Sequence, residues 1–292
     1  MEVKEMNSIW KEIDITNWDD FEDQITKLKR REWLFRGHSD ASWELSTSYN
    51  RLFNDLQPII ENAKGKPRIF AEKEHERLLV RAFQKHANLY LPFLPDRKKT
   101  LDWLAIMQHY GTPTRLLDVT LSPNIALYFA LETGSGDCCV FAINHAAIKR
   151  RNQRVYKYRT YKRINEVLFV NEPKPEDPDN DNLFSEKLDN KQFITVYNPQ
   201  YGNERWVVQQ GLFLVPSQID TSFESLLEDY ELDTDFDIGI KFVIHKSLRF
   251  EGIEKLRQMN ISSASLFPGI DGFCKSLKFQ ILETTQNQKL LE

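Results

Sequence analysis

Cysteine is scarce in this sequence, and its scarcity excludes two kinds of small domain. Three cysteines occur among 292 residues: Cys138 and Cys139 are adjacent, and Cys274 lies far from both. This number and spacing provide neither the disulfide framework of a small secreted domain nor the paired ligands of a structural zinc site. We therefore expect the adjacent cysteines to be small buried residues on a strand, in a protein of the reducing cytoplasm.

Long apolar runs are also absent. No stretch approaches the roughly 20 apolar residues that a membrane-spanning helix requires, and the segment from Met1 to Met6 contains no apolar signal region. The histidines show no spacing typical of metal ligands. We expect a cytoplasmic protein with no membrane segment and no bound metal.

The sequence has no surplus of positive charge. Its formal net charge is -4, which argues against a surface that binds nucleic acid over its whole extent. One segment is an exception, because lysines, arginines and tyrosines are interleaved from Lys149 to Arg163. Most charge runs are solvated, so the first interpretation of this segment is a solvated helix face or loop. The second is a local nucleic-acid groove.

The composition is that of an ordinary globular protein, with 41% hydrophobic and 28% charged residues. No internal repeat is visible, and the only candidate boundary is a loop at 172–181 that is rich in proline and aspartate. We expect a single domain with insertions over residues 1–292. Its core motifs would occupy about residues 30–215, and a strand and turn segment would occupy residues 216–292.

Helical patterns dominate the first half of the sequence and strand patterns dominate the second. Helices are predicted from Asn17, over 71–91, from Thr100 or Asp102, and over 124–132, the last with Ser122 as cap and Pro123 at its first position. Strands are predicted over 32–37, 138–143, 192–196, 205–208, 212–215 and 241–244, and a short extended segment over 42–49. This distribution favours an α+β fold.

Two short motifs, about seventy residues apart, are the strongest functional signal. One runs from Trp33 to His38 and the other from Gln108 to Thr120. Each places a charged or hydroxyl-bearing residue at the end of an apolar run, where a strand delivers a polar group to the edge of a sheet. We expect the two motifs to line one pocket.

These motifs resemble a known family. Trp-Leu-Phe-Arg-Gly-His at 33–38 is followed by Thr-Arg-Leu-Leu-Asp-Val-Thr at 114–120 and by Gln-Gln-Gly-Leu-Phe at 209–213. In this order they are similar to the FRG domain family, which is named for its Phe-Arg-Gly signature. The resemblance implies that the single domain is an FRG domain.

A second resemblance suggests a chemistry. Phe35-Arg36-Gly37 is similar to the aromatic-Arg-Gly strand of the Arg-Ser-Glu type ADP-ribosyltransferases, and residues 117–127 are similar to their Ser-Thr-Ser strand and the helix after it. This implies a split, mixed or antiparallel sheet with flanking helices and a helical insertion. It also implies an enzyme that uses NAD as co-substrate and modifies an intracellular protein or nucleic acid. The expected setting is a toxin with an antitoxin partner, or a phage-defence effector.

The chemistry of NAD indicates which residues such a site needs. A pyrophosphate requires a fixed cation, and Arg36 offers a planar fork of donors for it. Thr120 would orient the nicotinamide ribose, and Tyr128 would stack on the nicotinamide. The other candidates for contact with NAD are Gly37, His38, Asp118, Gln209 and Gln210.

The reaction also needs a carboxylate, because loss of nicotinamide leaves an oxocarbenium-like ribose. In the transferases, a glutamate begins the strand that corresponds to residues 205–208 here. Glu204 lies one or two positions away, so we predict that it reaches the pocket through a bulge in that strand. Asp118 is the next candidate acid. If neither acts, the site binds without catalysis.

These residues also have structural interpretations. Arg36 and Asp118 are able to form a buried ion pair, Asp118 is able to brace the following helix, and His109 is expected to favour a helix end. The alternative function is accordingly a non-enzymatic recognition module. In it, Arg36 and the basic segment from Lys149 would bind a phosphate-bearing ligand such as RNA.

Overall fold

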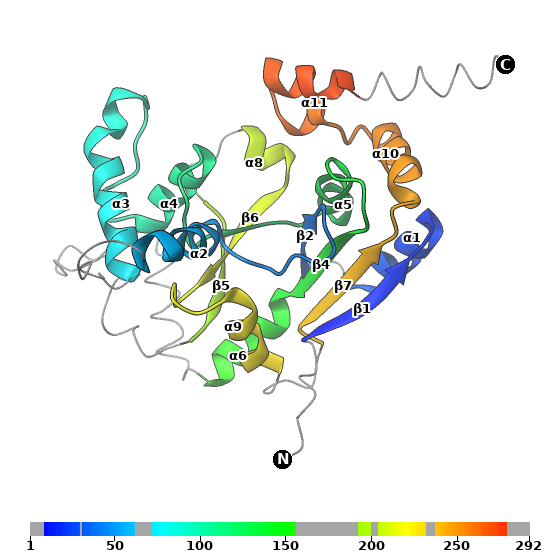
Figure 1. Cartoon of the computed structure of the whole chain (residues 1–292), viewed down its shortest axis with the longest axis horizontal. Helices are drawn as coiled ribbons and strands as arrows, with labels where there is room; N and C mark the ends of the chain where they lie inside the picture. The colour runs from blue at the N-terminus through cyan, green and yellow to red at the C-terminus, as the bar shows by residue number, and fades with distance from the viewer. Residues whose placement is uncertain are drawn as a thin grey trace.

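A computed structural model describes residues 9–29, 31–61, 72–155, 192–199, 204–231 and 237–278. Within these residues, a seven-stranded sheet forms the centre of the molecule, in the strand order β1-β7-β4-β2-β3-β6-β5 (Figure 1). The strands are β1 (Trp10–Ile15), β2 (Trp33–His38), β3 (Leu117–Thr120), β4 (Cys138–Asn144), β5 (Ile194–Tyr197), β6 (Gly211–Pro216) and β7 (Gly239–Ile244). Of the strand pairs in the described ranges, only β1 and β7 pair in parallel, so the sheet is mixed and mainly antiparallel.

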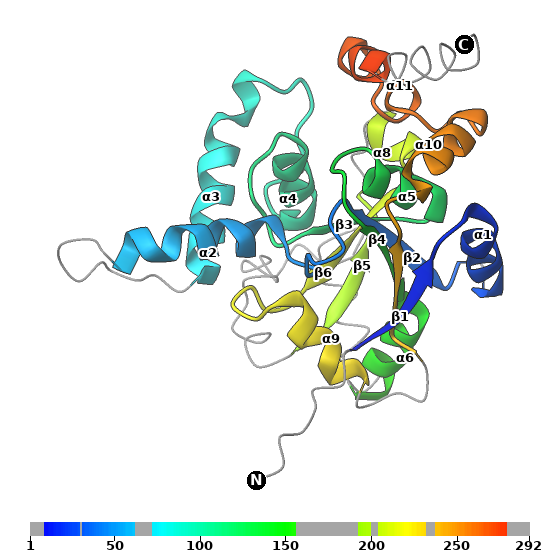
Figure 2. The same cartoon turned by 45° about the vertical axis from the view of Figure 1, so that its right-hand side comes forward.

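Helices cover both faces of the sheet. They are α1 (Trp18–Lys27), α2 (Ser48–Glu61), α3 (Glu72–His86), the 3-10 helix η1 (Ala87–Leu89), α4 (Thr100–His109), α5 (Pro123–Leu131), α6 (His145–Val155), α8 (Glu204–Val208), α9 (Phe223–Glu231), α10 (Leu248–Gln258) and α11 (Ser263–Leu266). In Figure 2, α1, α5 and α10 lie on the right of the view, and α6 and α9 lie below the sheet. Helices α2, α3 and α4 form a group on the left. The α+β class predicted from the sequence is confirmed.

Strand β4 explains why both faces need a cover. Its seven residues are all buried, and side chains alternate between the two faces of a strand. Cys138, Val140 and Ala142 pack into the core under α1, α5 and α10. Cys139, Phe141 and Ile143 pack into a second core with α6 and α9. The prediction of two small buried cysteines on a strand is confirmed.

A third core lies under the helical group. Leu104 and Met107 of α4 pack there with Val80 of α3 and with Phe213 and Val215 of β6. Helices α3 and α4 are therefore attached to the β6 side of the sheet, and α2, which lies beside them in Figures 1 and 2, completes a helical layer.

Several sequence predictions of individual elements were wrong. Residues 205–208, predicted as a strand, lie in helix α8, and residues 48–49 of the predicted extended segment begin helix α2. The segment after Pro216 holds β7 but also α9, α10 and α11, so it is more helical than predicted. The predicted loop at 172–181 and the basic residues from 156 to 163 lie outside the described residues.

Among the helices that are described, none has the length and apolar character that crossing a membrane requires. Within the same residues, no group of three or more histidine, cysteine, aspartate or glutamate side chains is placed to hold a metal ion.

Candidate functional site

The two sequence motifs meet at adjacent strands in the middle of the sheet. Strand β2 pairs with β4 on one side and with β3 on the other, where Phe35 lies opposite Thr120. Helix α5 packs directly on β2, because a Cβ atom on Gly37 would lie 1.9 Å from the carbonyl oxygen of Ala126. Arg36 and His38 alternate with Gly37 along the strand and so point to the opposite face from this helix.

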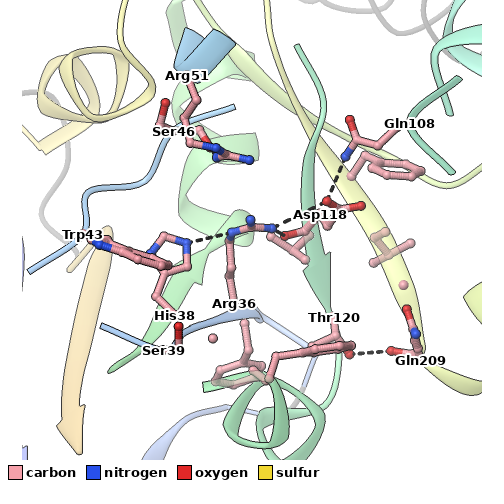
Figure 3. Close-up of a pocket in the computed structure, with 18 of the residues that line it drawn as sticks. Arg36, His38, Ser39, Trp43, Ser46, Arg51, Gln108, Asp118, Thr120 and Gln209 are labelled. Carbon is pink, nitrogen blue, oxygen red and sulfur yellow. Dashed lines mark hydrogen bonds and ion pairs between the residues drawn. The ribbon is translucent and has the colours of Figure 1, made fainter. Parts of the chain in front are cut away.

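A pocket of about 930 Å³ opens where these strands end (Figure 3). This volume lies within the range of about 300–1,000 Å³ that is typical of ligand sites. The first motif contributes Arg36, Gly37 and His38, and the second contributes Gln108, His109, Asp118 and Thr120. The sequence prediction that both motifs line one pocket is confirmed.

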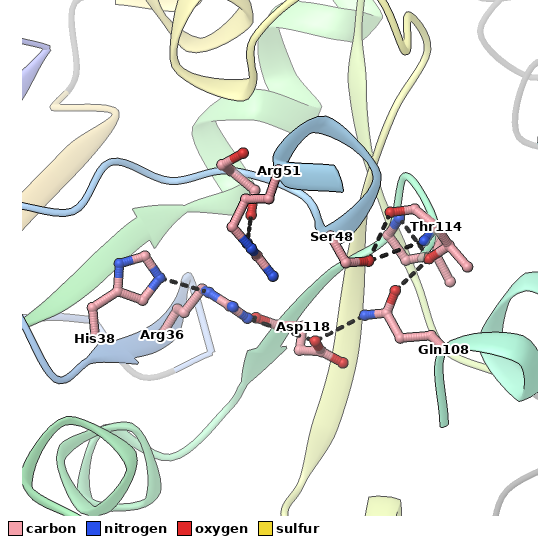
Figure 4. Close-up of polar contacts among 9 residues, drawn as sticks. Arg36, His38, Ser48, Arg51, Gln108, Thr114 and Asp118 are labelled. Carbon is pink, nitrogen blue, oxygen red and sulfur yellow. Dashed lines mark hydrogen bonds and ion pairs between the residues drawn. The ribbon is translucent and has the colours of Figure 1, made fainter. Parts of the chain in front are cut away.

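Arg36 is held in this pocket by two neighbours. Its Nη1 donates to the carbonyl oxygen of Asp118 at 2.7 Å and lies 3.7 Å from the Asp118 Oδ2 (Figure 4). Its Nε donates to His38 Nε2 at 3.0 Å. Burial lowers the pKa of Arg36, and the nearby Asp118 carboxylate opposes that shift. The ion pair considered as a structural alternative is thus present, but it is not the buried pair that was expected, because the Asp118 side chain is 60% exposed and both residues line the pocket.

His38 accepts the hydrogen bond from Arg36, so its Nε2 must be unprotonated. Burial, together with the Arg36 charge, lowers the pKa of His38 from 6.5 to about 3. The ring is therefore neutral at physiological pH, with its proton on Nδ1. His38 fixes the plane of the Arg36 guanidinium.

Asp118 combines a fixed position with an accessible carboxylate. Gln108 Nε2 donates to its Oδ2 at 2.8 Å, and the Oε1 of Gln108 accepts from Thr114 Oγ1. The side chain of Asp118 is nevertheless 60% exposed, against 19% for Arg36. Asp118 does not cap helix α5, because that role belongs to Ser122, whose Oγ accepts from the Ile125 amide.

Thr120 and Gln209 line the pocket, but their polar groups mainly hold the backbone. Thr120 Oγ1 donates to the Gln209 carbonyl at 2.8 Å, and Gln209 Nε2 donates to the Leu266 carbonyl at 2.9 Å. Gln210 adopts a left-handed conformation (φ 48°), is exposed, and is not among the residues that line the pocket. Its role is to turn the chain from α8 into β6.

Two predicted site residues, the stacking ring of Tyr128 and the carboxylate of Glu204, lie outside the pocket. Tyr128 is 2% exposed in the core, where its hydroxyl contacts Ser263 Oγ at 2.7 Å, and burial raises its pKa. It cannot stack on a ligand in the pocket. Glu204 is the exposed first residue of α8 rather than part of a bulged strand, and it does not line the pocket. The predicted bulge is therefore wrong.

The pocket is also lined by residues that the sequence analysis did not single out. Trp43, 55% exposed, stands beside His38 with the ring centroids 6.1 Å apart. Arg51 of α2 lines the pocket above Arg36 and further lowers its pKa. Arg205 and Trp206 of α8 line the opposite end. No strand-end pattern marked these residues, because they lie in a loop and in two helices.

His109 is the last residue of α4, as expected from its sequence position, and it also lines the pocket. Its ring contacts that of Trp206, with centroids 5.8 Å apart. Burial and the Arg205 charge lower the pKa of His109.

Comparison with known proteins gives one match. Residues 31–137 match the model of the FRG domain family. This region contains Arg36, Gln108 and Asp118 but ends before α8 and β6. Searches of curated proteins and of solved structures found no match for the chain.

Proposed function

We propose that this chain, which is an FRG domain protein, is an enzyme of the ADP-ribosyltransferase type that binds NAD in the pocket and cleaves its bond to nicotinamide. The observation that carries the proposal is the pairing of Arg36 with Asp118. These residues come from two motifs that are distant in the sequence, and both face the same large pocket. The Nη1 of Arg36 lies 3.7 Å from the Oδ2 of Asp118. A fixed cation beside an accessible carboxylate is what this reaction requires.

The cations suit a pyrophosphate. Among the described residues, the side chain of Arg36 makes hydrogen bonds only through Nε and Nη1. Its Nη2 has no hydrogen-bond partner there. Arg51 lies close enough to Arg36 to affect its pKa, so two guanidinium groups converge on one space. A pyrophosphate carries two negative charges and accepts paired hydrogen bonds from such groups.

An exposed aromatic ring suits the bases of NAD. Trp43 takes over the stacking role that was predicted for Tyr128, because its ring lines the pocket and is 55% exposed. Aromatic rings stack on any base, since each base presents a π face.

The carboxylate of Asp118 suits the reacting ribose. When the bond between the nicotinamide nitrogen and ribose C1 breaks, its electron pair leaves with the nicotinamide and positive charge develops on the sugar. A fixed carboxylate stabilises that charge. Gln108 holds Asp118 in place while leaving most of its side chain accessible.

The arrangement of elements supports the finer fold expected from the resemblance. Phe35-Arg36-Gly37 lies on a central strand, and β3 beside it leads directly into helix α5. This is the order of strand, strand and helix that the ADP-ribosyltransferase motifs imply. A toxin or phage-defence effector, with an antitoxin to restrain it, is the setting that this activity would suit.

Mutation of the pair tests the proposal. We expect Arg36→Ala to weaken NAD binding by about 1.5–3 kcal/mol, because it removes a charge-assisted contact. Asp118→Asn should keep binding within a few-fold but lower nicotinamide release by about 10²-fold. Calorimetry measures the affinity for NAD, and chromatography measures the nicotinamide that is released. Glu204→Gln is the matched control for the carboxylate, and Arg81→Ala, on the exposed side of α3, is the control for the arginine. Full release in Asp118→Asn would contradict the proposal.

The alternative of a non-enzymatic phosphate-binding module rests here on the same pocket, because the described part of the basic segment, residues 149–155, lies in helix α6. Trp33 pairs with Asn144, so helix α6, which follows Asn144, begins at the opposite end of β2 from His38. Arg151 of α6 is buried, and its guanidinium carbon lies 4.4 Å from the centroid of the Tyr230 ring. Binding of NAD that depends on Arg36, without any nicotinamide release, would favour this alternative.

A further inference from the structure

The pocket has a second end, beyond Asp118, with its own cation and aromatic ring. We infer that this end, formed by Arg205, Trp206 and His109, binds the acceptor of ADP-ribose, and that the acceptor is a phosphorylated nucleoside. The inference rests on the proposed function, because it assigns the partner of the same reaction. The phosphorylated nucleoside would be either a free nucleotide or the end of a nucleic-acid strand.

Strand order separates the two ends. Trp43 contacts His38 on β2, whereas Trp206 contacts Phe213 on β6, with ring centroids 5.8 Å apart. Strand β3, which carries Asp118, lies between β2 and β6. Strands are spaced by about 4.8 Å, so the ends lie roughly 10 Å apart. Asp118 therefore has a group of cationic and aromatic side chains on each side.

Arg205 is the strongest indication of a ligand at the second end. Its guanidinium lies over the Phe267 ring, 4.7 Å from the centroid, and it lines the pocket. Across the described part of the chain, the Arg205 guanidinium makes no hydrogen bond and no ion pair within 4.0 Å, and only the backbone carbonyl of this residue accepts a hydrogen bond, from the Gln209 amide. Burial lowers the pKa of Arg205, while Asp118 and Glu132 oppose the shift from a distance. A half-buried cation without a direct counter-ion favours an anionic ligand.

A second cation strengthens the positive field there. The Nζ of Lys275 lies 4.8 Å from the centroid of the same Phe267 ring. A cationic acceptor, such as the guanidinium of a substrate protein, would be repelled by Arg205 and Lys275, whereas a phosphate would be attracted. The Trp206 and His109 rings offer apolar surface to the base of a nucleotide.

The transfer itself balances without a further reactant. An oxygen of the acceptor phosphate forms a bond to ribose C1 as the bond to the nicotinamide nitrogen breaks. The electron pair of the broken bond stays on that nitrogen, and neutral nicotinamide leaves. A phosphate dianion has no proton to lose, so the step needs no general base, and Asp118 acts only on the charge of the sugar.

The test offers labelled NAD to the full chain with four acceptors in turn: a 5′-phosphorylated single-stranded oligonucleotide, the same oligonucleotide without its phosphate, a nucleoside monophosphate, and an arginine-rich protein. We expect label on phosphorylated acceptors alone, identified by mass spectrometry. The strand and the monophosphate distinguish the two sources of the phosphate. Arg205→Ala should lower this transfer by about tenfold or more while leaving acceptor-free nicotinamide release within about twofold. Arg205→Lys, which keeps the charge, should retain part of the transfer.

Label on the arginine-rich protein, or equal label with and without the terminal phosphate, would overturn the inference. If no nicotinamide is released under any condition, the proposed function fails instead. The second end is then still tested by fluorescence anisotropy with the phosphorylated oligonucleotide. Binding that is unchanged by Arg205→Ala, in a variant with an unchanged melting temperature, would reject the assignment of this end. Arg81→Ala serves again as the matched control.

Discussion

Arg36 and His38 share one hydrogen bond, and its direction fixes the protonation of both residues. Because Arg36 can only donate, His38 Nε2 must accept, which requires a neutral ring. The pKa of about 3 for His38 matches this requirement. A protonated His38 would place a second positive charge beside Arg36, and its Nε2 could no longer accept the hydrogen bond that orients the Arg36 guanidinium. The position of the pocket cation therefore depends on a buried neutral histidine.

This dependence predicts an acid sensitivity. In the unfolded chain His38 binds a proton below about pH 6.5, whereas in the folded protein it does so only near pH 3. The folded state therefore loses stability as the pH falls between these values, by up to about 1.4 kcal/mol per pH unit. In His38→Gln, where the amide oxygen can still accept from Arg36, we expect this loss to be absent. Urea unfolding of both proteins across this pH range gives the comparison. Parallel curves would show that His38 does not titrate in this way.

The sequence indicated part of the site at this scale. Arg36, His38, Asp118 and Thr120 were expected in one pocket because strand ends bring such residues together, and all four line it. Tyr128 failed because its helix turns that ring into the core. Trp43 and Arg51 could not be found, since their approach depends on how the loop and helix after β2 fold back over the sheet.

The close packing of β2 on α5 is the feature of the elements that shapes the site. Gly37 allows the strand to touch the helix backbone, since an added Cβ would meet Ala126 O at 1.9 Å and Ala130 N at 2.8 Å. Neither atom belongs to a flexible side chain that is able to move aside. A larger residue at this position must push the two elements apart.

We therefore expect Gly37→Ala to destabilise the protein by about 1–3 kcal/mol, the usual cost of overpacking. Denaturant unfolding followed by circular dichroism measures the change. Gly136→Ala is the matched control, because a Cβ there has no atom within 4 Å. If both variants unfold at the same denaturant concentration, the close approach of β2 and α5 is not as tight as described.

The elements themselves were predicted where local signals and tertiary packing agree. Strand β4 and helix α5 are examples, since one is an unbroken apolar run and the other begins with its Ser122 cap and Pro123. Residues 205–208 have β-forming side chains, but Trp206 packs on Phe213 and the left-handed Gln210 reverses the chain, which requires a helical turn. Helix α2 was missed because it contains Pro58 and leaves apolar side chains exposed.

At the scale of the whole molecule, the pocket depends on two layers being held together. Strands β2 and β3 supply Arg36 and Asp118, while α2 and α4 of the helical layer supply Arg51 and Gln108. One buried ion pair joins these layers. Glu76 of α3 contacts Arg115, whose Nη2 lies 2.6 Å from its Oε2, and Arg115 Nη1 also donates to the Ser217 carbonyl beyond β6 at 3.1 Å.

This ion pair gives the last prediction. Glu76 and Arg115 are 0% and 1% exposed, so neutralising Glu76 removes a charged partner at 2.6 Å from a buried arginine. We expect Glu76→Gln to lower the free energy of unfolding by about 3–5 kcal/mol. The matched control lies on the same helix: Glu74 pairs with Arg77 at 3.6 Å, both are 40% exposed, and Glu74→Gln should cost at most about 1 kcal/mol. Urea unfolding measures both. Because the pair anchors the helical layer, limited proteolysis of Glu76→Gln should cut within α2 to α4 before the sheet. Equal stability of the two variants would mean that the apolar packing of Leu104 and Met107 holds the layer without the ion pair.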